Sequence, residues 1–357
     1  MKQDPKRKIA IIGASGYGGL QSVSLLKDHP HFEISYLAGN KTSGQLWNEM
    51  YPHLKLDSNP LIQDIDLEKI ISTSNYVVIS LPNGLSSQLV PSLLDRGLRV
   101  VDLSADYRYR SLDKWKSVYN LESKAFNRKD NDLCSTAIYG LPEWNTAEIS
   151  KARLVACPGC FPTASLIPLL PLLKQGLIDT DGIIIDAKSG TSGGGRTPTE
   201  NLLLAEASET ISPYKVIGHR HTSEIEQEAS KISGKSINLQ FTPHLVPMVR
   251  GLLSTIYSKL RDPGLTAEDC QTVLETFYKN NYFVQLLPVG TYPSTKWVRY
   301  TNKIMISVQV DQRTGQLILI SALDNLLKGQ AGQALQILNI MEKIPEEIGL
   351  PSSSLYP

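Results

Sequence analysis

The 357-residue sequence has few cysteines, no excess of charge of either sign, and no apolar run long enough to cross a bilayer. Four cysteines in a chain of this length argue against a disulfide framework and for reduced thiols. Lys and Arg number 36 against 35 Asp and Glu, so the chain offers no broad surface for nucleic acids or membranes. The most apolar stretch, residues 161–173, contains three prolines and is too short for a membrane span. The amino-terminal segment lacks the plan of a signal peptide, so we expect a cytoplasmic protein with no nucleic-acid or membrane partner.

The first part of the chain alternates short β-rich segments with helical ones. Apolar, β-branched runs predict strands at 9–12, 32–37, 76–81 and 98–103. Helical patterns at 13–28 and 87–95 lie between the first and second of these strands and between the third and fourth. Because strand–helix–strand repetition implies parallel pairing with right-handed crossovers, this part is predicted to be an α/β, doubly wound, Rossmann-like nucleotide-binding domain.

The pattern changes after about residue 155. Longer segments with alternating polarity predict strands at 183–187, 237–241, 251–260 and 304–310, with few helical patterns between them. This is typical of a mixed α+β domain in which one face of the sheet is covered. Residues 324–340 read as a final amphipathic helix.

A glycine-rich turn, Gly13 to Gly19 (GASGYGG), follows the first predicted strand and opens a helix. Gly13 permits a tight turn, and Gly16 lets the backbone approach a pyrophosphate at the helix N-terminus. The spacing is G-x-x-G-x-x-G rather than the usual G-x-G-x-x-G, and the alternative is a plain strand–helix turn. We interpret the turn as a cofactor site and select Gly13 and Gly16 in it.

The loop after the second strand decides between NAD and NADP. An NAD site usually places an acidic side chain there for the ribose hydroxyls, but this loop carries Asn40, Lys41, Thr42 and Ser43. A cation and hydroxyls suit a 2′-phosphate, so we select Lys41 and Ser43 and prefer NADP as the cofactor. The alternative is an ordinary polar loop.

A cysteine near the predicted domain boundary is the candidate nucleophile. Cys160 follows the Pro158-Gly159 turn and precedes a helical run, so it is placed at a helix N-terminus, where the dipole stabilises a thiolate. Three alternatives remain open: buried core cysteines, a Cys157–Cys160 dithiol redox pair, and half of a zinc site. The zinc interpretation lacks a second C-x-x-C, so no metal is predicted.

A histidine motif, residues 218–227 (GHRHTSEIEQ), reads as a loop entering a helix that Thr222 or Ser223 caps. A histidine here, held by Glu224, is a candidate general acid/base for a thiol. Alone, such a histidine is more often a surface or capping residue.

Anionic substrates require cations, and three arginines are candidates for binding one. Arg108 follows the fourth strand at the carboxyl edge of the sheet, where ligands bind in open α/β folds. Arg196 ends a glycine-rich loop whose start, Ser189-Gly190, offers main-chain N–H groups to an anion, unless the loop is simply flexible. Arg250 is the third, although each arginine alone reads more simply as a surface ion-pair partner.

Taken together, these motifs resemble the N-acetyl-gamma-glutamyl-phosphate reductase family (type 1), and more distantly the aspartate-semialdehyde dehydrogenases. The resemblance covers nearly the whole chain and rests on these segments, in order: GASGYGG, LSADYR, YGLPEW, CPGCFPT, SGTSGGGR, HRHTSEIEQ, FTPHLVPMVRG and DNLLKGQAGQALQ. It implies an NADP-binding domain at 1–156 with 325–357 returning to it, and a catalytic and dimerisation domain of the semialdehyde dehydrogenase type at 157–324.

The resemblance also implies roles for single residues. Cys160 matches the nucleophile, and His221 (less well His219) matches the acid/base. The family's first motif places the NADP pyrophosphate against Ser15, Gly16, Tyr17 and Gly18. The segment from Asn325 to Gly332 is expected near the nicotinamide. The implied reaction reduces N-acetyl-gamma-glutamyl phosphate with NADPH through a thioester on Cys160, in arginine biosynthesis, within a homo-oligomer. The residue before Pro158 is commonly Asn in the family, and here it is Cys157, which places a second thiol beside the nucleophile.

Other functions fit the same motifs. The same chemistry could act on N-acetyl-aminoadipyl phosphate or on aspartyl phosphate. A regulatory protein that senses NADPH, with a thiol switch at Cys157 and Cys160, is a more distant alternative.

Overall fold

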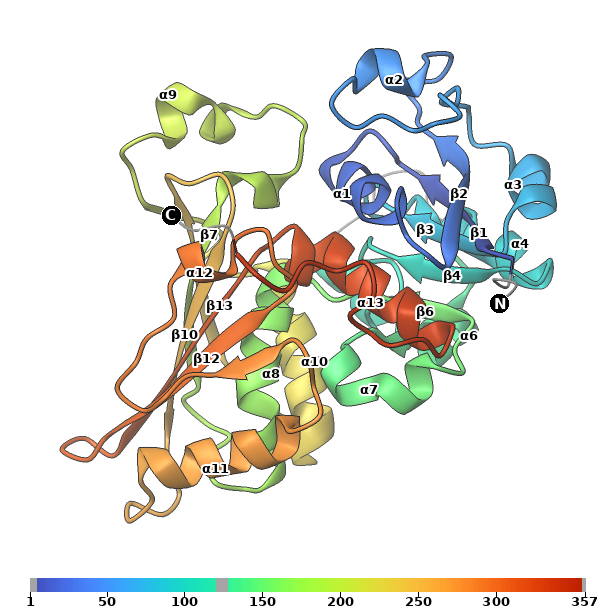
Figure 1. Ribbon diagram of the computed structural model, residues 1–357. Helices are drawn as coiled ribbons and strands as arrows, with labels where there is room; N and C mark the ends of the chain where they lie inside the picture. The colour runs from blue at the N-terminus through green and yellow to red at the C-terminus, as the bar shows by residue number, and fades with distance from the viewer. Residues whose placement is uncertain (1–4, 120–127, 355–357) are drawn as a thin grey trace. The chain divides into compact units, whose positions relative to one another are not determined.

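The computed structural model describes residues 5–119 and 128–354, so both ends of the predicted NADP-binding domain, 1–4 and 355–357, lie outside the described residues. The chain divides into two compact units (Figure 1). Unit 1 comprises Met1–Pro158 and Gln330–Leu350, and unit 2 comprises Gly159–Gly329 and Pro351–Pro357. Among the described residues, no helix combines the length and the apolar character needed to cross a membrane.

Unit 1 is built on a parallel sheet with strand order β2-β1-β3-β4-β6-β5. The strands are β1 (Arg7–Ile12), β2 (Phe32–Ala38), β3 (Tyr76–Ile79), β4 (Arg99–Asp102), β5 (Ile138–Tyr139) and β6 (Leu154–Ala156). The helices are α1 (Tyr17–Leu26), α2 (Trp47–Met50), α3 (Leu67–Thr73), α4 (Val90–Asp95), α5 (Leu112–Tyr119), α6 (Asn131–Thr136), α7 (Pro142–Ile149) and α13 (Gly332–Met341), with a 3-10 turn η1 (Ser86–Gln88).

Both faces of this sheet are covered. Ala10 and Ile12 of β1 belong to a core cluster shared with side chains of α3, α4 and α5. The alternate residues Ile9 and Ile11 are also fully buried, and α1 and α13 pack against the sheet. Burial on two faces explains the continuous apolar runs in the sequence and confirms the doubly wound prediction.

Unit 2 contains a mixed sheet with order β11-β12-β13-β10-β7-β9-β8. The strands are β7 (Ile184–Gly190), β8 (Ser212–Pro213), β9 (Gln240–Val246), β10 (Leu252–Lys259), β11 (Val284–Leu286), β12 (Ile304–Asp311) and β13 (Gln316–Leu323). The helices are α8 (Cys160–Lys174), α9 (Leu204–Ala207), α10 (Arg220–Ser233), α11 (Ala267–Tyr278) and α12 (Thr295–Val298), with 3-10 turns η2 (Thr191–Gly194) and η3 (Glu200–Leu202) and a π-helical turn η4 (Leu327–Ala331).

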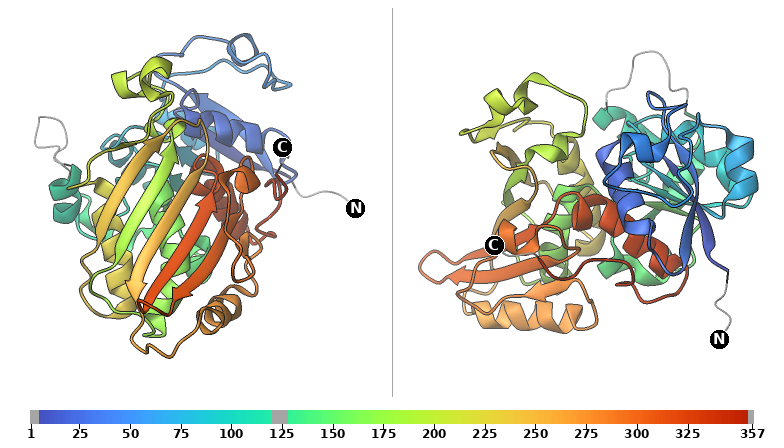
Figure 2. Two further views of the ribbon diagram at one scale, coloured as in Figure 1. Left: turned by 90° about the vertical axis from the view of Figure 1, so that its left-hand side faces the viewer. Right: turned by 45° about the horizontal axis from the view of Figure 1, so that its top comes forward.

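Helices cover one face of the unit 2 sheet. Helix α8 packs against β10 and β13, and α10 and α11 pack against α8. The left panel of Figure 2 shows the opposite face without a layer of described helices over it. Along β10, Leu252, Ser254 and Ile256 are buried while Leu253 and Thr255 are half-buried, the alternation expected when only one face is covered. The sequence underestimated the helices of this unit, since α8, α10 and α11 form the covering layer.

Helix α8 continues through prolines that would ordinarily interrupt it. Pro168 and Pro171 lack the N–H groups that would bond the carbonyls four residues earlier. The Ser321 hydroxyl donates to the freed carbonyl of Ala164 at 2.6 Å, and the Tyr278 hydroxyl donates to that of Ile167 at 2.5 Å. Because side chains of neighbouring elements satisfy these acceptors, α8 stays a single buried helix and holds Cys160 at its first position.

Candidate active site

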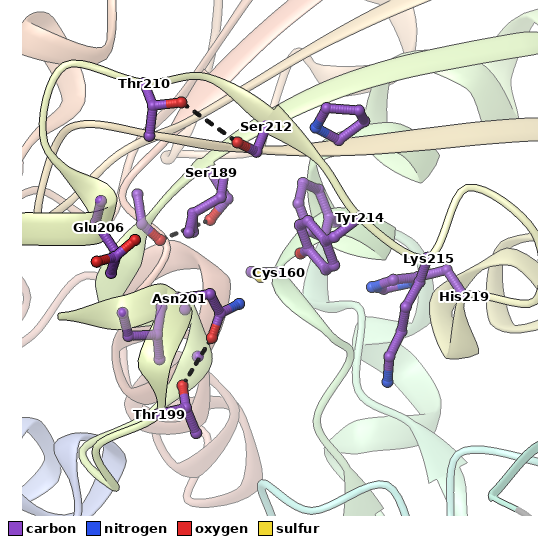
Figure 3. A pocket seen from close by; sticks show the side chains of 18 of the residues that line it. Cys160, Ser189, Thr199, Asn201, Glu206, Thr210, Ser212, Tyr214, Lys215 and His219 are labelled. Atoms are coloured by element: carbon purple, nitrogen blue, oxygen red, sulfur yellow. Dashed lines mark hydrogen bonds between the residues drawn. The ribbon is translucent and has the colours of Figure 1, made fainter.

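Cys160 begins α8 and lines a cavity of about 850 Å³ in unit 2 (Figure 3). Gly159 precedes it in extended conformation, and no described side chain caps the first turn of the helix. The main-chain N–H groups at such a terminus and the helix dipole favour a thiolate over a thiol. The half-buried Cys160 therefore has the position of a nucleophile, as its sequence context predicted.

Glu224 secures the turn before the nucleophile. This carboxylate of α10 is fully buried, and its Oε1 accepts a hydrogen bond from the Gly159 N–H at 2.9 Å. Glu224 therefore contacts the main chain beside Cys160, a contact that the sequence did not indicate. A buried charge-assisted bond of this kind orients the first residues of α8.

The His221 ring lies against the same turn. A Cβ added to Gly159 would come within 2.7 Å of Cε1 of His221, so glycine is needed there to admit the ring. His221 is buried and lies in the first turn of α10, one residue after the helix begins at Arg220. The structure thus brings together the two predicted catalytic residues, Cys160 and His221, within one unit.

His219 has a different place from His221. It is the N-cap of α10, and its Nδ1 accepts a hydrogen bond from the His221 N–H at 3.1 Å. The prediction that Thr222 or Ser223 caps this helix is therefore wrong, because the histidine ring supplies the acceptor. Burial, helped by the charges of Arg220 and Lys215, lowers the pKa of His219 to about 3. His219 is therefore neutral at physiological pH.

Aromatic rings fix the orientation of both histidines. Ring centroids lie 4.9 Å apart for His219 and His221, 5.9 Å for Phe161 and His221, and 5.6 Å for Tyr214 and His219. Phe241 packs against Phe161 and His219 from β9. Such tilted and edge-on contacts restrict ring rotation beside the nucleophile.

Ser189 and Gly190, at the end of β7, also line the Cys160 cavity. A Cβ at Gly190 would meet the carbonyl oxygens of Met248 and Val249 at 2.8 Å, so glycine permits this close packing. Asn325 supports the loop beyond: its Nδ2 donates to Ser192 Oγ at 2.9 Å, and its Oδ1 accepts from the Gly251 N–H at 2.8 Å. These predicted cofactor residues therefore belong to unit 2, on the cavity wall and directly behind it.

The three predicted substrate arginines have different environments. Arg108 is buried in unit 1, where its Nε donates to the Cys157 carbonyl at 2.8 Å and its Nη2 to the Leu103 carbonyl at 3.1 Å. Arg250 forms a two-point ion pair with the buried Asp324, at 3.0 and 2.9 Å. Arg196 is exposed and follows the η2 loop, two residues of which line the cavity.

The segment 199–215 forms much of the cavity wall, and sequence reasoning missed it. It contributes Glu206, Tyr214 and Lys215, among other residues, and Figure 3 shows these side chains around Cys160. Burial and the nearby Cys160 raise the pKa of Tyr214 above its ordinary value. The only signal in the sequence was the Tyr214-Lys215 pair shortly before the histidine motif.

The glycine turn of unit 1 has the shape of a pyrophosphate cradle. Gly13 adopts φ +84°, and a Cβ there would lie 2.9 Å from the Ser80 carbonyl carbon. A Cβ at Gly18 would lie 2.5 Å from Ser80 Oγ. At Gly16 the space is more open, because the nearest atom to a Cβ there would be the Gly13 carbonyl oxygen at 3.6 Å. Helix α1 begins at Tyr17 without a side-chain cap, so its first N–H groups and its dipole fit a diphosphate.

The loop after β2 adjoins this turn. A Cβ at Gly39 would meet Ser15 Oγ at 3.5 Å and would come still nearer to Thr42 Oγ1. The Thr42 hydroxyl is buried and has no hydrogen-bond partner among the described residues. With Lys41 exposed and Ser43 half-buried beside it, and no carboxylate between 39 and 44, the loop fits a phosphorylated ribose. The sequence pattern predicted Lys41 and Ser43 of this loop as cofactor contacts but not Thr42.

Two buried carboxylates stabilise the loops at the carboxyl ends of β3 and β4. Asp106 accepts from the Gly84 N–H at 2.5 Å and from the Ser87 N–H at 3.0 Å. Ser86 Oγ lies 2.9 Å from Asp102 Oδ2 and 3.1 Å from Asp106 Oδ2, linking the two acids. Burial, followed by the charge of Asp106, raises the pKa of Asp102 to about 6.

Cysteine and metal chemistry can be judged from the same structure. All four cysteines are free thiols. Within 5–119 and 128–354, no group of three or more His, Cys, Asp or Glu side chains is placed to hold a metal ion.

Comparisons with known proteins agree on one family. The model for the semialdehyde dehydrogenase NAD binding domain matches residues 8–152, and the model for the semialdehyde dehydrogenase dimerisation domain matches residues 160–325. An N-acetyl-gamma-glutamyl-phosphate reductase of Prochlorococcus marinus is 65% identical over 350 residues, 98% of each chain. One from Parasynechococcus marenigrum is 63% identical over 350 residues, with the same coverage of both chains.

Solved structures show the same fold at low identity. Aspartate semialdehyde dehydrogenase II of Vibrio cholerae has a TM-score of 0.72 and 17% identity, over 95% of this chain and 99% of the other. The Candida albicans aspartate semialdehyde dehydrogenase, solved with NADP, has a TM-score of 0.70 and 17% identity, over 94% and 98% of the two chains. From its motifs, its two units and its relatives, the chain belongs to the N-acetyl-gamma-glutamyl-phosphate reductase family of semialdehyde dehydrogenases.

Proposed function

We propose that this chain reduces N-acetyl-gamma-glutamyl phosphate to N-acetyl-glutamate 5-semialdehyde and phosphate with NADPH, as a step of arginine biosynthesis. The observation that carries the proposal is the site geometry in unit 2. A cysteine at a helix N-terminus and a histidine against the preceding residue share one cavity. The relatives of that name, similar over nearly the full chain, support the choice of substrate.

The thiolate of Cys160 attacks the acyl carbon of the substrate, a C–S bond forms, and the C–O bond to phosphate breaks. Phosphate leaves with the bonding electron pair, and a thioester remains on the enzyme. NADPH, when bound, would supply a hydride to the thioester carbonyl, which would give a hemithioacetal anion. His221 then gives a proton to the sulfur as the C–S bond breaks, which releases the aldehyde. Afterwards His221 takes the proton back and restores the thiolate.

Several contacts support His221 rather than His219 as the acid/base. The Nδ1 of His219 already accepts the N-cap hydrogen bond of α10, and its lowered pKa keeps the ring neutral. The His221 ring lies against Gly159, next to the nucleophile. Glu224 acts as a positioning residue, because it holds the Gly159 N–H.

For the cofactor we propose NADP, bound by the glycine turn and the β2 loop of unit 1. The N-terminus of α1 suits the diphosphate, with Gly13, Ser15, Gly16, Tyr17 and Gly18 around it. Lys41, Ser43 and the partnerless Thr42 hydroxyl suit the 2′-phosphate. Ser189, Gly190 and Asn325 of unit 2 remain proposed contacts for the nicotinamide end.

Among the predicted arginines, Arg196 remains a proposed substrate contact because it is exposed beyond the η2 loop. The guanidinium of Arg108 is bonded to main-chain carbonyls and that of Arg250 to Asp324, so we propose that each of these arginines holds the loops around it within its own unit.

We further propose a homo-oligomer that works in the cytoplasm. The uncovered face of the unit 2 sheet, which carries half-buried side chains such as Leu253, Ile318 and Ile320, suits a second copy of the same face, and the family model of this region is a dimerisation domain. Catalysis needs a reduced Cys160, and all four cysteines are free thiols, in keeping with a reducing compartment. Light scattering that gave only monomers would contradict the oligomer.

The test is phosphate-dependent NADP reduction with N-acetyl-glutamate semialdehyde, run in the oxidative direction because the acyl phosphate is labile. We expect turnover that requires both phosphate and NADP, with aspartate semialdehyde inert. Cys160→Ser should lose at least roughly 1000-fold in turnover and still bind NADPH. Activity only with N-acetyl-aminoadipate semialdehyde would keep the mechanism and change the pathway. Silence with every aldehyde, with intact NADPH binding, would favour a regulatory protein.

A further inference from the structure

Cations are scarce in the wall of the Cys160 cavity. Among the described residues that line it, Lys215 and Arg220 are the only lysine or arginine side chains. The substrate of the proposed reaction carries a phosphate and a carboxylate, so the cavity has to recognise two anionic groups. The predicted candidates Arg108 and Arg250 have their guanidinium groups bonded to other parts of the protein.

Within residues 5–119 and 128–354, no carboxylate lies within 4.0 Å of the Lys215 Nζ, and this ammonium group makes no hydrogen bond. An ammonium group at a cavity wall without a protein partner is available to a ligand. Figure 3 shows the Lys215 side chain running beside the His219 ring, with Glu206 on the opposite side of Cys160. The acidic side chains, Glu200 and Glu206, and Lys215 all come from the segment before α10, whereas Arg220 is the first residue of α10.

The backbone at Lys215 is an independent sign of function. Its φ is +44°, in the left-handed region that lysine rarely adopts. Tyr214 just before it is fixed to the sheet, because its N–H donates to the Pro243 carbonyl at 3.1 Å. Strained backbone of this kind persists where the surroundings hold it and gathers at ligand sites. Glycine would fit the conformation without strain, so we infer that the lysine side chain contributes a contact that offsets the strain.

We propose that Lys215 recognises a substrate oxyanion in the Cys160 cavity. This inference rests on the proposed function, because it assigns the anionic groups of that substrate to a wall of the cavity. A phosphate and a carboxylate offer the same chemistry to an ammonium group, so the experiment separates them.

The test compares Lys215→Met, Lys215→Arg and Lys215→Gly with a matched control, Lys231→Met. Lys231 is exposed in the last turn of α10, outside the cavity lining. In the oxidative direction, KM is measured separately for phosphate, for the semialdehyde and for NADP. Loss of one charge-assisted contact should raise KM about 10- to 100-fold for phosphate or for the semialdehyde.

The other variants sharpen the expected pattern. Lys215→Arg should restore most of the affinity, and Lys231→Met should match the wild type. Lys215→Gly should lose affinity like the Met variant while its Tm is no lower, because glycine relieves the backbone strain. A rise in KM for phosphate assigns Lys215 to the phosphate, and a rise for the semialdehyde assigns it to the carboxylate.

Other results would overturn the inference. Lys215 does not bind the substrate if all three KM values of Lys215→Met lie within twofold of the wild type. The same conclusion holds if only the KM for NADP changes. Calorimetric binding of inorganic phosphate and of N-acetyl-glutamate to Cys160→Ser protein, with and without Lys215→Met, gives an answer that needs no turnover. If Lys215→Met changes the affinity of Cys160→Ser protein for neither anion, the inference is contradicted, even when the wild type is inactive. An inactive wild type alone contradicts only the proposed reaction.

Discussion

Replacing Gly159 by alanine tests the proposed role of His221 without substituting either proposed catalytic residue. The backbone at Gly159, φ −67° and ψ 157°, is open to alanine, so the substitution adds no backbone strain. The new Cβ would lie 2.7 Å from Cε1 of His221. Since carbon atoms in contact sit about 3.5–4.0 Å apart, the ring has to move by about 1 Å.

A shift of that size in a catalytic group typically costs about 100-fold in rate. We therefore expect kcat to fall about 100-fold in Gly159→Ala, with KM for NADP unchanged, because the cradle lies in unit 1. The local repacking should cost about 1–3 kcal/mol of stability, so the protein should stay folded at 25 °C.

The assay is the phosphate-dependent reduction of NADP, with unfolding followed in parallel. Gly264→Ala, on an exposed turn of unit 2, serves as the control for the substitution itself. In a His221→Ala background, Gly159→Ala should add little further loss, because the ring it displaces is absent. Wild-type kcat in Gly159→Ala, or full additivity of the two losses, would refute the assignment of His221.

Four further substitutions probe the cofactor loop, the α10 cap and the two buried acids. Thr42→Val should raise KM for NADP roughly tenfold and leave KM for NAD unchanged, because it removes one hydroxyl from the 2′-phosphate site; equal effects on both would remove Thr42 from that site. His219→Asn keeps an N-cap acceptor. The wild-type His219 pKa of about 3 lies below the unfolded value, so stability is lost as pH falls below about 6.5. Urea unfolding at several pH values measures this loss. Below pH 6.5 the free energy of unfolding of the Asn variant should fall less steeply than that of the wild type, by up to about 1.4 kcal/mol per pH unit. Asp106→Asn should lower the free energy of unfolding by about 2–3 kcal/mol. Its amide NH₂ group would face the N–H group of Gly84 or Ser87, and two donors cannot pair. The raised pKa of Asp102 makes the wild type lose stability as pH rises from about 4 to 6. An amide at this position does not titrate and avoids that loss. Asp102→Asn should therefore lower the free energy of unfolding at pH 7 by less than about 1 kcal/mol. Equal costs for the two acids would contradict this account.

Much of the fold could be predicted from local pattern. Runs such as residues 9–12 and 76–79 are apolar at every position because both faces of the unit 1 sheet are covered. In unit 2, alternation along β10 marked a sheet covered on one face only. The final helix was expected from residue 324, whereas a π-helical turn, η4, comes first and α13 begins at Gly332. Hydrophobic periodicity does not distinguish these two kinds of turn.

The site was predictable only where chemistry and local sequence coincide. Cys160 follows Pro158-Gly159 and starts a helix, so its position could be read from neighbouring residues. Lys215 and Glu206 could not be found in this way, because their segment has no motif and reaches the cavity through pairing of β8 with β9.

The sequence by itself determined the class of fold, the glycine-rich turn and the place of Cys160 at the start of a helix, since each depends on residues within one or two turns of chain. Tertiary structure alone decided which groups meet. Glu224 reaches Gly159 across 65 positions of sequence, and Ser321 and Tyr278 satisfy carbonyls of α8 from strands and helices far along the chain. Among the residues that the structure describes, it left Lys215 without a partner carboxylate, whereas Arg250 pairs with Asp324. Local pattern cannot carry such information, because a hydrogen bond or an ion pair depends on distances in space that only the packed chain sets.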